Sequence, residues 1–145
     1  MTDTPFPADQ RLSHDELAAF LNQAFPAGAR RLLGDLVTVK PGHVRMALDP
    51  DADMLRPGGI VSGPAQMGLV DVAAYAVILA HIGPVAMAVT STLSISFLRA
   101  AQARLIHADA CLLKLGRRLA TVDVRLWQDS EDRLIAQSTV GYALP

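Results

Sequence analysis

The sequence contains little cysteine, few aromatic residues and no excess of charge of either sign. The single cysteine, Cys111, excludes an internal disulfide. The 13 Lys and Arg residues against 14 Asp and Glu residues give a net charge of -1. This balance provides no broad positive field to attract nucleic acid or an anionic membrane. Residues 1–10 lack the basic and then apolar layout of a signal peptide. We therefore expect a cytoplasmic protein with neither of those partners.

Charged residues are also scarce, at 19% of the chain, whereas hydrophobic residues make up 51%. An ordinary globular domain has about a quarter charged residues. No Ser/Gly-rich linker or run of charge divides the 145 residues, so we expect one domain over residues 1–145. The apolar excess predicts a buried subunit interface, and hence a homodimer or homotetramer.

A long apolar segment between Pro64 and Pro84 predicts a central helix. Gly63 is suited to its N-cap with Pro64 at the first helical position, and Gly83 is suited to its end. The segment approaches the length of a membrane span, but Asp71 would be costly inside a bilayer. Because the helix is apolar on nearly every face, we interpret it as buried inside a soluble domain.

The rest of the chain predicts a sheet that wraps this helix. Ser13 is suited to the N-cap of a short amphipathic helix that ends near Pro26. Alternating or apolar runs then predict strands at residues 32–39, 44–48, 87–97, 104–115, 119–128 and 134–143. Short connections make consecutive strands antiparallel, which gives an α+β fold. Such a sheet covers one side of the helix, so we expect a second subunit to complete the burial.

The segment around the start of the long helix resembles the hotdog-fold thioesterases of the phenylacetate-degradation (PaaI-like) type. In that family a His-Gly-Gly triplet opens the central helix, and the catalytic Asp or Glu lies nine positions after the histidine. Here Ser62, Gly63 and Pro64 occupy the triplet, and Asp71 lies nine positions after Ser62. The resemblance runs from about Arg56 to the C-terminus. It also includes the Gly116-Arg117 turn and the apolar strand that follows it.

The resemblance implies a hotdog fold and the hydrolysis of an acyl-CoA to free acid and CoA. It assigns Asp71 as general base or nucleophile and Thr90 as a hydroxyl that assists hydrolysis. Gly63 would hold the oxyanion, since the free N–H groups at a helix N-terminus favour developing negative charge. The family's histidine is replaced by Ser62, and Pro64 lacks the N–H of the second glycine.

Asp71 also stands out without the resemblance, because its neighbours along the helix are apolar. A poorly solvated carboxylate is a reactive group and is often functional. The alternative is a packing role in which Asp71 bonds to a nearby hydroxyl such as that of Tyr75, one turn away.

Five basic residues are candidates for binding the phosphates of CoA, because guanidinium and ammonium groups bind phosphate well. Arg99 follows Phe97-Leu98, where the family places a contact near the nucleotide. Arg56 stands six positions before Ser62, where some members carry an asparagine. The alternative for each is an ordinary solvated surface position. The five residues are Arg56, Arg99, Lys114, Arg117 and Arg118.

The four histidines show no ligand spacing, so we expect no metal, and no cofactor beyond the CoA of the substrate. Two other functions stay open. The loss of the family's histidine favours a non-catalytic domain that binds acyl-CoA. A hotdog dehydratase or hydratase ranks last, because that chemistry uses a catalytic histidine paired with an acidic residue.

Overall fold

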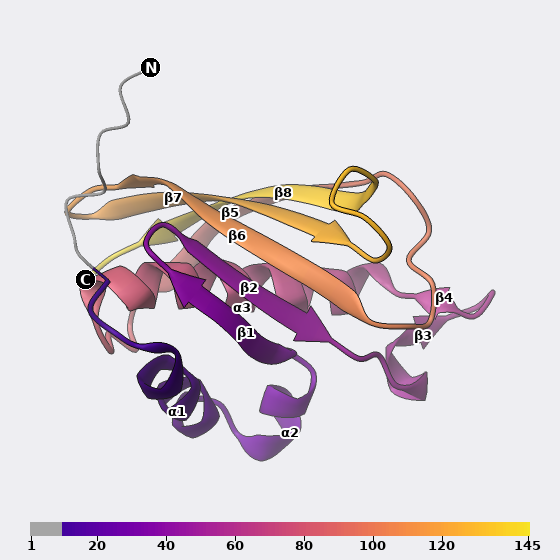
Figure 1. Cartoon of the computed structure of the whole chain (residues 1–145), viewed down its shortest axis with the longest axis horizontal. Coiled ribbons are helices and arrows are strands. Elements are labelled where there is room, and N and C mark those ends of the chain that lie inside the picture. The colour runs from indigo at the N-terminus through magenta and orange to yellow at the C-terminus, as the bar shows by residue number, and fades with distance from the viewer. Residues whose placement is uncertain (1–9) are drawn as a thin grey trace.

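The computed structural model describes residues 10–145 and shows an antiparallel sheet curved around one long helix (Figure 1). The helices are α1 (His14–Ala24), α2 (Ala27–Arg31) and α3 (Gly63–Ile82), with a 3-10 turn, η1 (Ala52–Met54). The main sheet consists of β1 (Asp35–Lys40), β2 (His43–Leu48), β5 (Val89–Phe97), β6 (Ile106–Leu115), β7 (Leu119–Trp127) and β8 (Leu134–Ala143). A small ribbon of β3 (Leu55–Arg56) and β4 (Ile60–Val61) precedes α3.

Helix α3 is the core of the fold, as the apolar segment predicted. Its side chains from Val72 to His81 are all buried. By length and composition α3 could cross a membrane, but 72% of its most apolar stretch of 18 residues is buried within this fold. The sheet supplies that burial, so the interpretation of α3 as a buried helix is confirmed.

The N-cap of α3 differs from the prediction. Ser62 occupies it, in extended conformation, and its hydroxyl accepts the N–H of Ala65 at 3.2 Å. Gly63 is the first helical residue rather than the cap. A serine hydroxyl satisfies a free N–H of the first turn and is therefore a better cap than glycine, which has no side-chain acceptor.

The main sheet has the strand order β1-β2-β6-β7-β8-β5, and every neighbouring pair is antiparallel. This confirms the predicted sheet. The two edge strands differ in how they are covered. The β1 edge lies beside α1, where His14 Nε2 is 3.1 Å from the main-chain oxygen of Leu36. No element of the described chain covers the outer edge of β5, which is nine residues long.

Two strands differ locally from the simple predicted pattern: β1 in where it begins, and β5 in its register with β8. β1 begins at Asp35 rather than residue 32, because α2 continues to Arg31 and Gly34 turns the chain with φ of +80°. A Cβ on Gly34 would lie 2.7 Å from the main-chain oxygen of Ala47, so this close approach requires glycine. In β5 the alternation fails at Ser91, where the register with β8 shifts between Thr90 and Thr92.

Helix α1 begins as predicted. Ser13 caps it, and Glu16 returns a hydrogen bond to the main-chain N–H of Ser13, which completes a capping box. Leu17 and Leu21 lie on its buried face and join the core. Packed in this way, α1 forms one wall of the cavity described next.

Candidate active site

A cavity of about 540 Å³ lies between α1, α3 and the neighbouring ends of β5 and β8. Asp71 of α3, Thr90 of β5 and Tyr142 of β8 contribute its main polar groups. Most of the remaining wall is apolar and comes from Phe20, Phe25, Leu33, Val72, Ala88 and Val89. Asp71 therefore faces a mostly apolar space, with its side chain half-buried rather than enclosed.

The Asp71 carboxylate accepts two hydrogen bonds from hydroxyl groups. Thr90 Oγ1 donates to Asp71 Oδ1 at 2.7 Å, and the Tyr142 hydroxyl donates to the same oxygen at 2.7 Å. The predicted alternative partner is wrong, because the Tyr75 hydroxyl donates to the main-chain oxygen of Ala86 at 3.2 Å. Thr90 and Asp71 are thus brought together as the resemblance implied.

Sequence reasoning missed Tyr142. Its side chain is 3% exposed, and its position on the inner face of β8 follows from the alternation of that strand. What the sequence does not give is the pairing that places Tyr142 directly opposite Thr90. Burial, and then the charge of Asp71, raises the pKa of the Tyr142 hydroxyl far above its ordinary value. The hydroxyl therefore stays protonated and acts as a donor.

Gly63 lies in a second cavity, of about 500 Å³, at the N-terminal end of α3. Phe97, Arg56 and Arg99 also line it, so three of the residues singled out in the sequence meet there. No residue of this cavity lines the one that contains Asp71. Asp71 is eight positions beyond Gly63, which is about 12 Å along a helix. Within one copy of the chain, these two groups are not brought together.

The other three basic residues lie elsewhere. Lys114, Arg117 and Arg118 are exposed at the connection between β6 and β7. Arg117 lines a cleft with Ile82 at the C-terminal end of α3, whereas Arg56 and Arg99 are at the N-terminal end. One copy of the chain therefore does not gather the five predicted phosphate ligands into a single patch.

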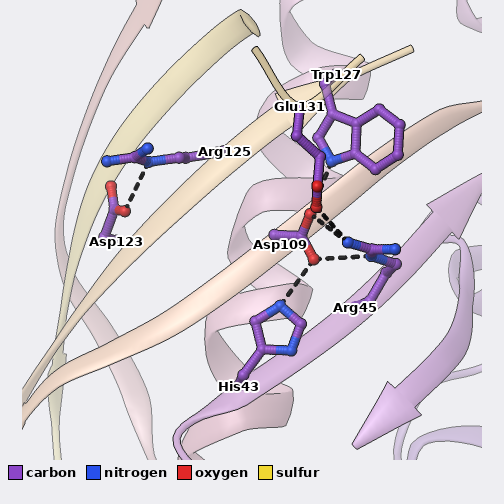
Figure 2. Close-up of polar contacts among 7 residues, drawn as sticks. All are labelled: His43, Arg45, Asp109, Asp123, Arg125, Trp127 and Glu131. Carbon is purple, nitrogen blue, oxygen red and sulfur yellow. Dashed lines mark hydrogen bonds and ion pairs between the residues drawn. The ribbon is translucent and has the colours of Figure 1, made fainter. Parts of the chain in front are cut away.

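A separate polar cluster covers the outer face of the sheet (Figure 2). Asp109 accepts hydrogen bonds from His43 Nε2 at 2.8 Å, Arg45 Nε at 2.8 Å and Trp127 Nε1 at 2.7 Å. Burial alone would raise the pKa of Asp109, but these donors outweigh burial and hold its pKa well below the ordinary value. Glu131 adds a second contact to Arg45. None of the five residues lines the Asp71 cavity.

No group of three or more His, Cys, Asp or Glu residues suited to a metal ion occurs within residues 10–145. The expectation that the protein needs neither metal nor cofactor stays a prediction, because nothing in the structure tests it.

An antiparallel sheet curved around a long apolar helix, with a carboxylate on that helix facing a cavity, is the hotdog arrangement that the resemblance implied. The sequence profile of the thioesterase superfamily matches residues 58–135. The chain belongs to this superfamily.

Solved structures agree with this assignment. A candidate thioesterase from Silicibacter sp. is 36% identical, with a TM-score of 0.85 and 95% of each chain covered. A phenylacetic acid degradation-related protein from Ralstonia eutropha is 28% identical, with a TM-score of 0.77 over 88% of this chain and 98% of that one. A Streptococcus mutans protein solved with acetyl-CoA is 22% identical and shares the fold, with a TM-score of 0.68 over 77% of this chain and 88% of that one. A search of curated proteins gives no significant match.

Proposed function

We propose that this protein hydrolyses an acyl-CoA thioester to a free acid and CoA, with Asp71 as the catalytic carboxylate. The observation that carries the proposal is the Asp71 carboxylate, which two hydroxyl groups hold at the wall of a mostly apolar cavity of about 540 Å³. A carboxylate fixed beside a space for an acyl group is the arrangement that thioester hydrolysis requires.

The reaction needs one activated oxygen and one stabilised oxyanion. In the first route Asp71 takes a proton from water as the water oxygen attacks the thioester carbonyl carbon. In the second route the carboxylate attacks that carbon itself, and water then hydrolyses the resulting anhydride. In both routes the C–S bond breaks and the CoA thiolate takes up a proton. The Gly63 N–H is suited to the oxyanion, because it begins α3 and lies outside the hydrogen bonds of the helix.

The cavity beside Asp71 has the size and lining expected for an aryl or medium-length acyl group. Ligand pockets range over about 300–1,000 Å³ and are lined mainly by apolar side chains. Phe20 of α1 and Phe25, which follows this helix, form one wall, and Val72 of α3 lies near Asp71 on another. The same fold holds acetyl-CoA in the Streptococcus mutans protein, so this architecture accommodates a CoA thioester.

Two copies of the chain complete the site in this proposal. Thr90 contacts Asp71 at the start of β5, and Phe97 lies against Gly63 at its end, where a Cβ on Gly63 would be 3.4 Å from the Phe97 ring. The free edge of β5 is suited to pair with a second copy. Antiparallel pairing centred near Ser94 would place Phe97 of one copy opposite Thr90 of the other. Gly63 of one chain would then approach Asp71 of its partner.

The same pairing bears on the CoA phosphates. Arg56 and Arg99 line the Gly63 cavity, so they would accompany Gly63 to the partner's Asp71. Lys114 near the end of β6, and Arg117 and Arg118 after it, lie at the end of the sheet where Ala120 pairs with Tyr142. Both basic groups would then border one shared site. We propose a cytoplasmic homodimer or homotetramer on this basis.

The test is thiol release from a panel of aryl, short, medium and long acyl-CoAs. The wild-type protein should release CoA from at least one class. Asp71→Asn keeps the shape and the hydroxyl contacts but removes the base, so turnover should fall by at least about 1,000-fold while folding is retained. Near-wild-type turnover in Asp71→Asn would overturn the mechanism.

The second candidate is a domain that binds acyl-CoA without cleaving it. It is favoured by Ser62, which stands in place of the family's histidine and whose hydroxyl is engaged in capping α3. Calorimetric binding of acyl-CoA without thiol release would decide for this function. Hydroxyacyl-CoA and enoyl-CoA substrates in the same panel test the dehydratase or hydratase function, for which no histidine of the described residues lines the Asp71 cavity.

A further inference from the structure

The two hydrogen bonds to Asp71 converge on one of its oxygens. Thr90 Oγ1 and the Tyr142 hydroxyl each lie 2.7 Å from Oδ1. Within residues 10–145 no group donates a hydrogen bond to Oδ2. The carboxylate therefore has one oxygen that is held by two donors and one that is free for another partner.

The pairing of β5 with β8 places both donors beside Oδ1 of Asp71. Thr90 and Tyr142 are direct partners across the β5–β8 ladder, so their side chains project side by side from the inner face. The Tyr142 hydroxyl also lies 3.1 Å from the main-chain oxygen of Asp71, and this second contact fixes it against the helix. The ring is 3% exposed and packs beside that of Tyr75, with centroids 6.1 Å apart.

We propose that Tyr142 is a positioning residue for the proposed thioester hydrolysis: with Thr90 it immobilises Oδ1 of Asp71 and thereby leaves Oδ2 as the oxygen that takes the water proton or attacks the thioester carbon. This rests on the proposed function and extends it to a residue on β8. A fixed carboxylate plane removes rotations that would otherwise separate Oδ2 from the substrate. In this role the Tyr142 hydroxyl acts through the Asp71 carboxylate to which it donates.

Tyr142→Phe tests the proposal, because it removes the hydroxyl and keeps the buried ring. We expect kcat for the best acyl-CoA to fall roughly 10- to 100-fold, the effect of one hydrogen bond to a charged group, while KM changes by less than about twofold. An unchanged kcat would overturn the proposal.

A second readout does not depend on turnover. In protein labelled with 13Cγ-aspartate, the Asp71 carboxyl signal is identified by its loss in Asp71→Asn, and its chemical shift at pH 7 is then compared between wild type and Tyr142→Phe. We expect the signal to move in the variant, because Oδ1 loses one of its two donors. Tyr75→Phe is the matched control, since its hydroxyl lines the same cavity but bonds to Ala86, and it should leave the signal in place.

The two readouts also separate the proposals. If the wild-type protein cleaves no acyl-CoA, the proposed function fails whatever the labelled signal shows. If wild type cleaves the thioester but Tyr142→Phe leaves both the labelled signal and kcat unchanged, the positioning role fails and the proposed function stands.

Discussion

Asp109 and Asp71 show how differently two aspartates of one chain can be used. Asp109 is held by three donors on the outer face of the sheet, and its side chain is 12% exposed (Figure 2). Within the described chain, protein donors hold both oxygens of that carboxylate, so it supports structure. Asp71 faces a cavity and keeps one oxygen free of hydrogen bonds from the described chain. The contrast supports a chemical role for Asp71.

Asp109→Asn should destabilise the fold in a pH-dependent way. Because the folded pKa of Asp109 lies below the ordinary value of about 4, its charge contributes stability that is fully present above that value and is lost as pH falls below it. We expect the variant to lose about 1–3 kcal/mol of unfolding free energy at pH 7, measured by urea titration at fixed protein concentration.

The difference between wild type and Asp109→Asn should shrink as the pH is lowered from about 4 towards 2. Asp129→Asn is the matched control, because the Asp129 side chain is 68% exposed and pairs with Arg104 at the surface. It should cost less than about 1 kcal/mol. A difference for Asp109→Asn that is the same at every pH would contradict the assignment of its stabilising charge.

At the scale of the elements, the helices and the sheet follow from the sequence more fully than the site does. The apolar segment after Pro64 and the short turns after β6 and β7 are local signals, and both were interpreted correctly. Asp71 and Thr90 were assigned through the resemblance to the PaaI-like thioesterases, and Asp71 also through its apolar neighbours along the helix. Tyr142 was not, because its role depends on the pairing of β5 with β8, two strands that are distant in sequence. The N-cap of α3 was misplaced by one residue.

The position of Ser62 at that cap gives a prediction for the element. Ser62→Ala should lower the unfolding free energy by about 1 kcal/mol, because the N–H of Ala65 loses its acceptor. Ser62→Asp should restore stability close to that of wild type, since aspartate is an equally good cap and its charge suits a helix N-terminus. Thermal unfolding of the three proteins measures this. Equal stability of Ser62→Ala and wild type would contradict a capping role.

At the scale of the whole molecule, the uncovered edge of β5 and the separation of the two cavities point to the same arrangement. Gly63 and Asp71 are about 12 Å apart along α3, and each contacts a different end of β5. Thr90 and Phe97 are separated by roughly 24 Å of extended strand. If β5 paired antiparallel with β5 of a second copy, Gly63 of each chain would lie near Asp71 of the other chain. The dimer would then have two equal sites.

Co-expression of two inactive variants tests this central claim most directly. Gly63→Pro removes the N–H donor at a helical position where proline is tolerated, Gly63→Ala is its control that keeps the N–H, and Asp71→Asn removes the carboxylate. Heterodimers of Gly63→Pro and Asp71→Asn, isolated through two different affinity tags, contain one intact and one doubly altered site. We predict about half of the wild-type thiol release per dimer from these heterodimers and almost none from either variant alone. Inactive heterodimers would contradict a site shared between two chains.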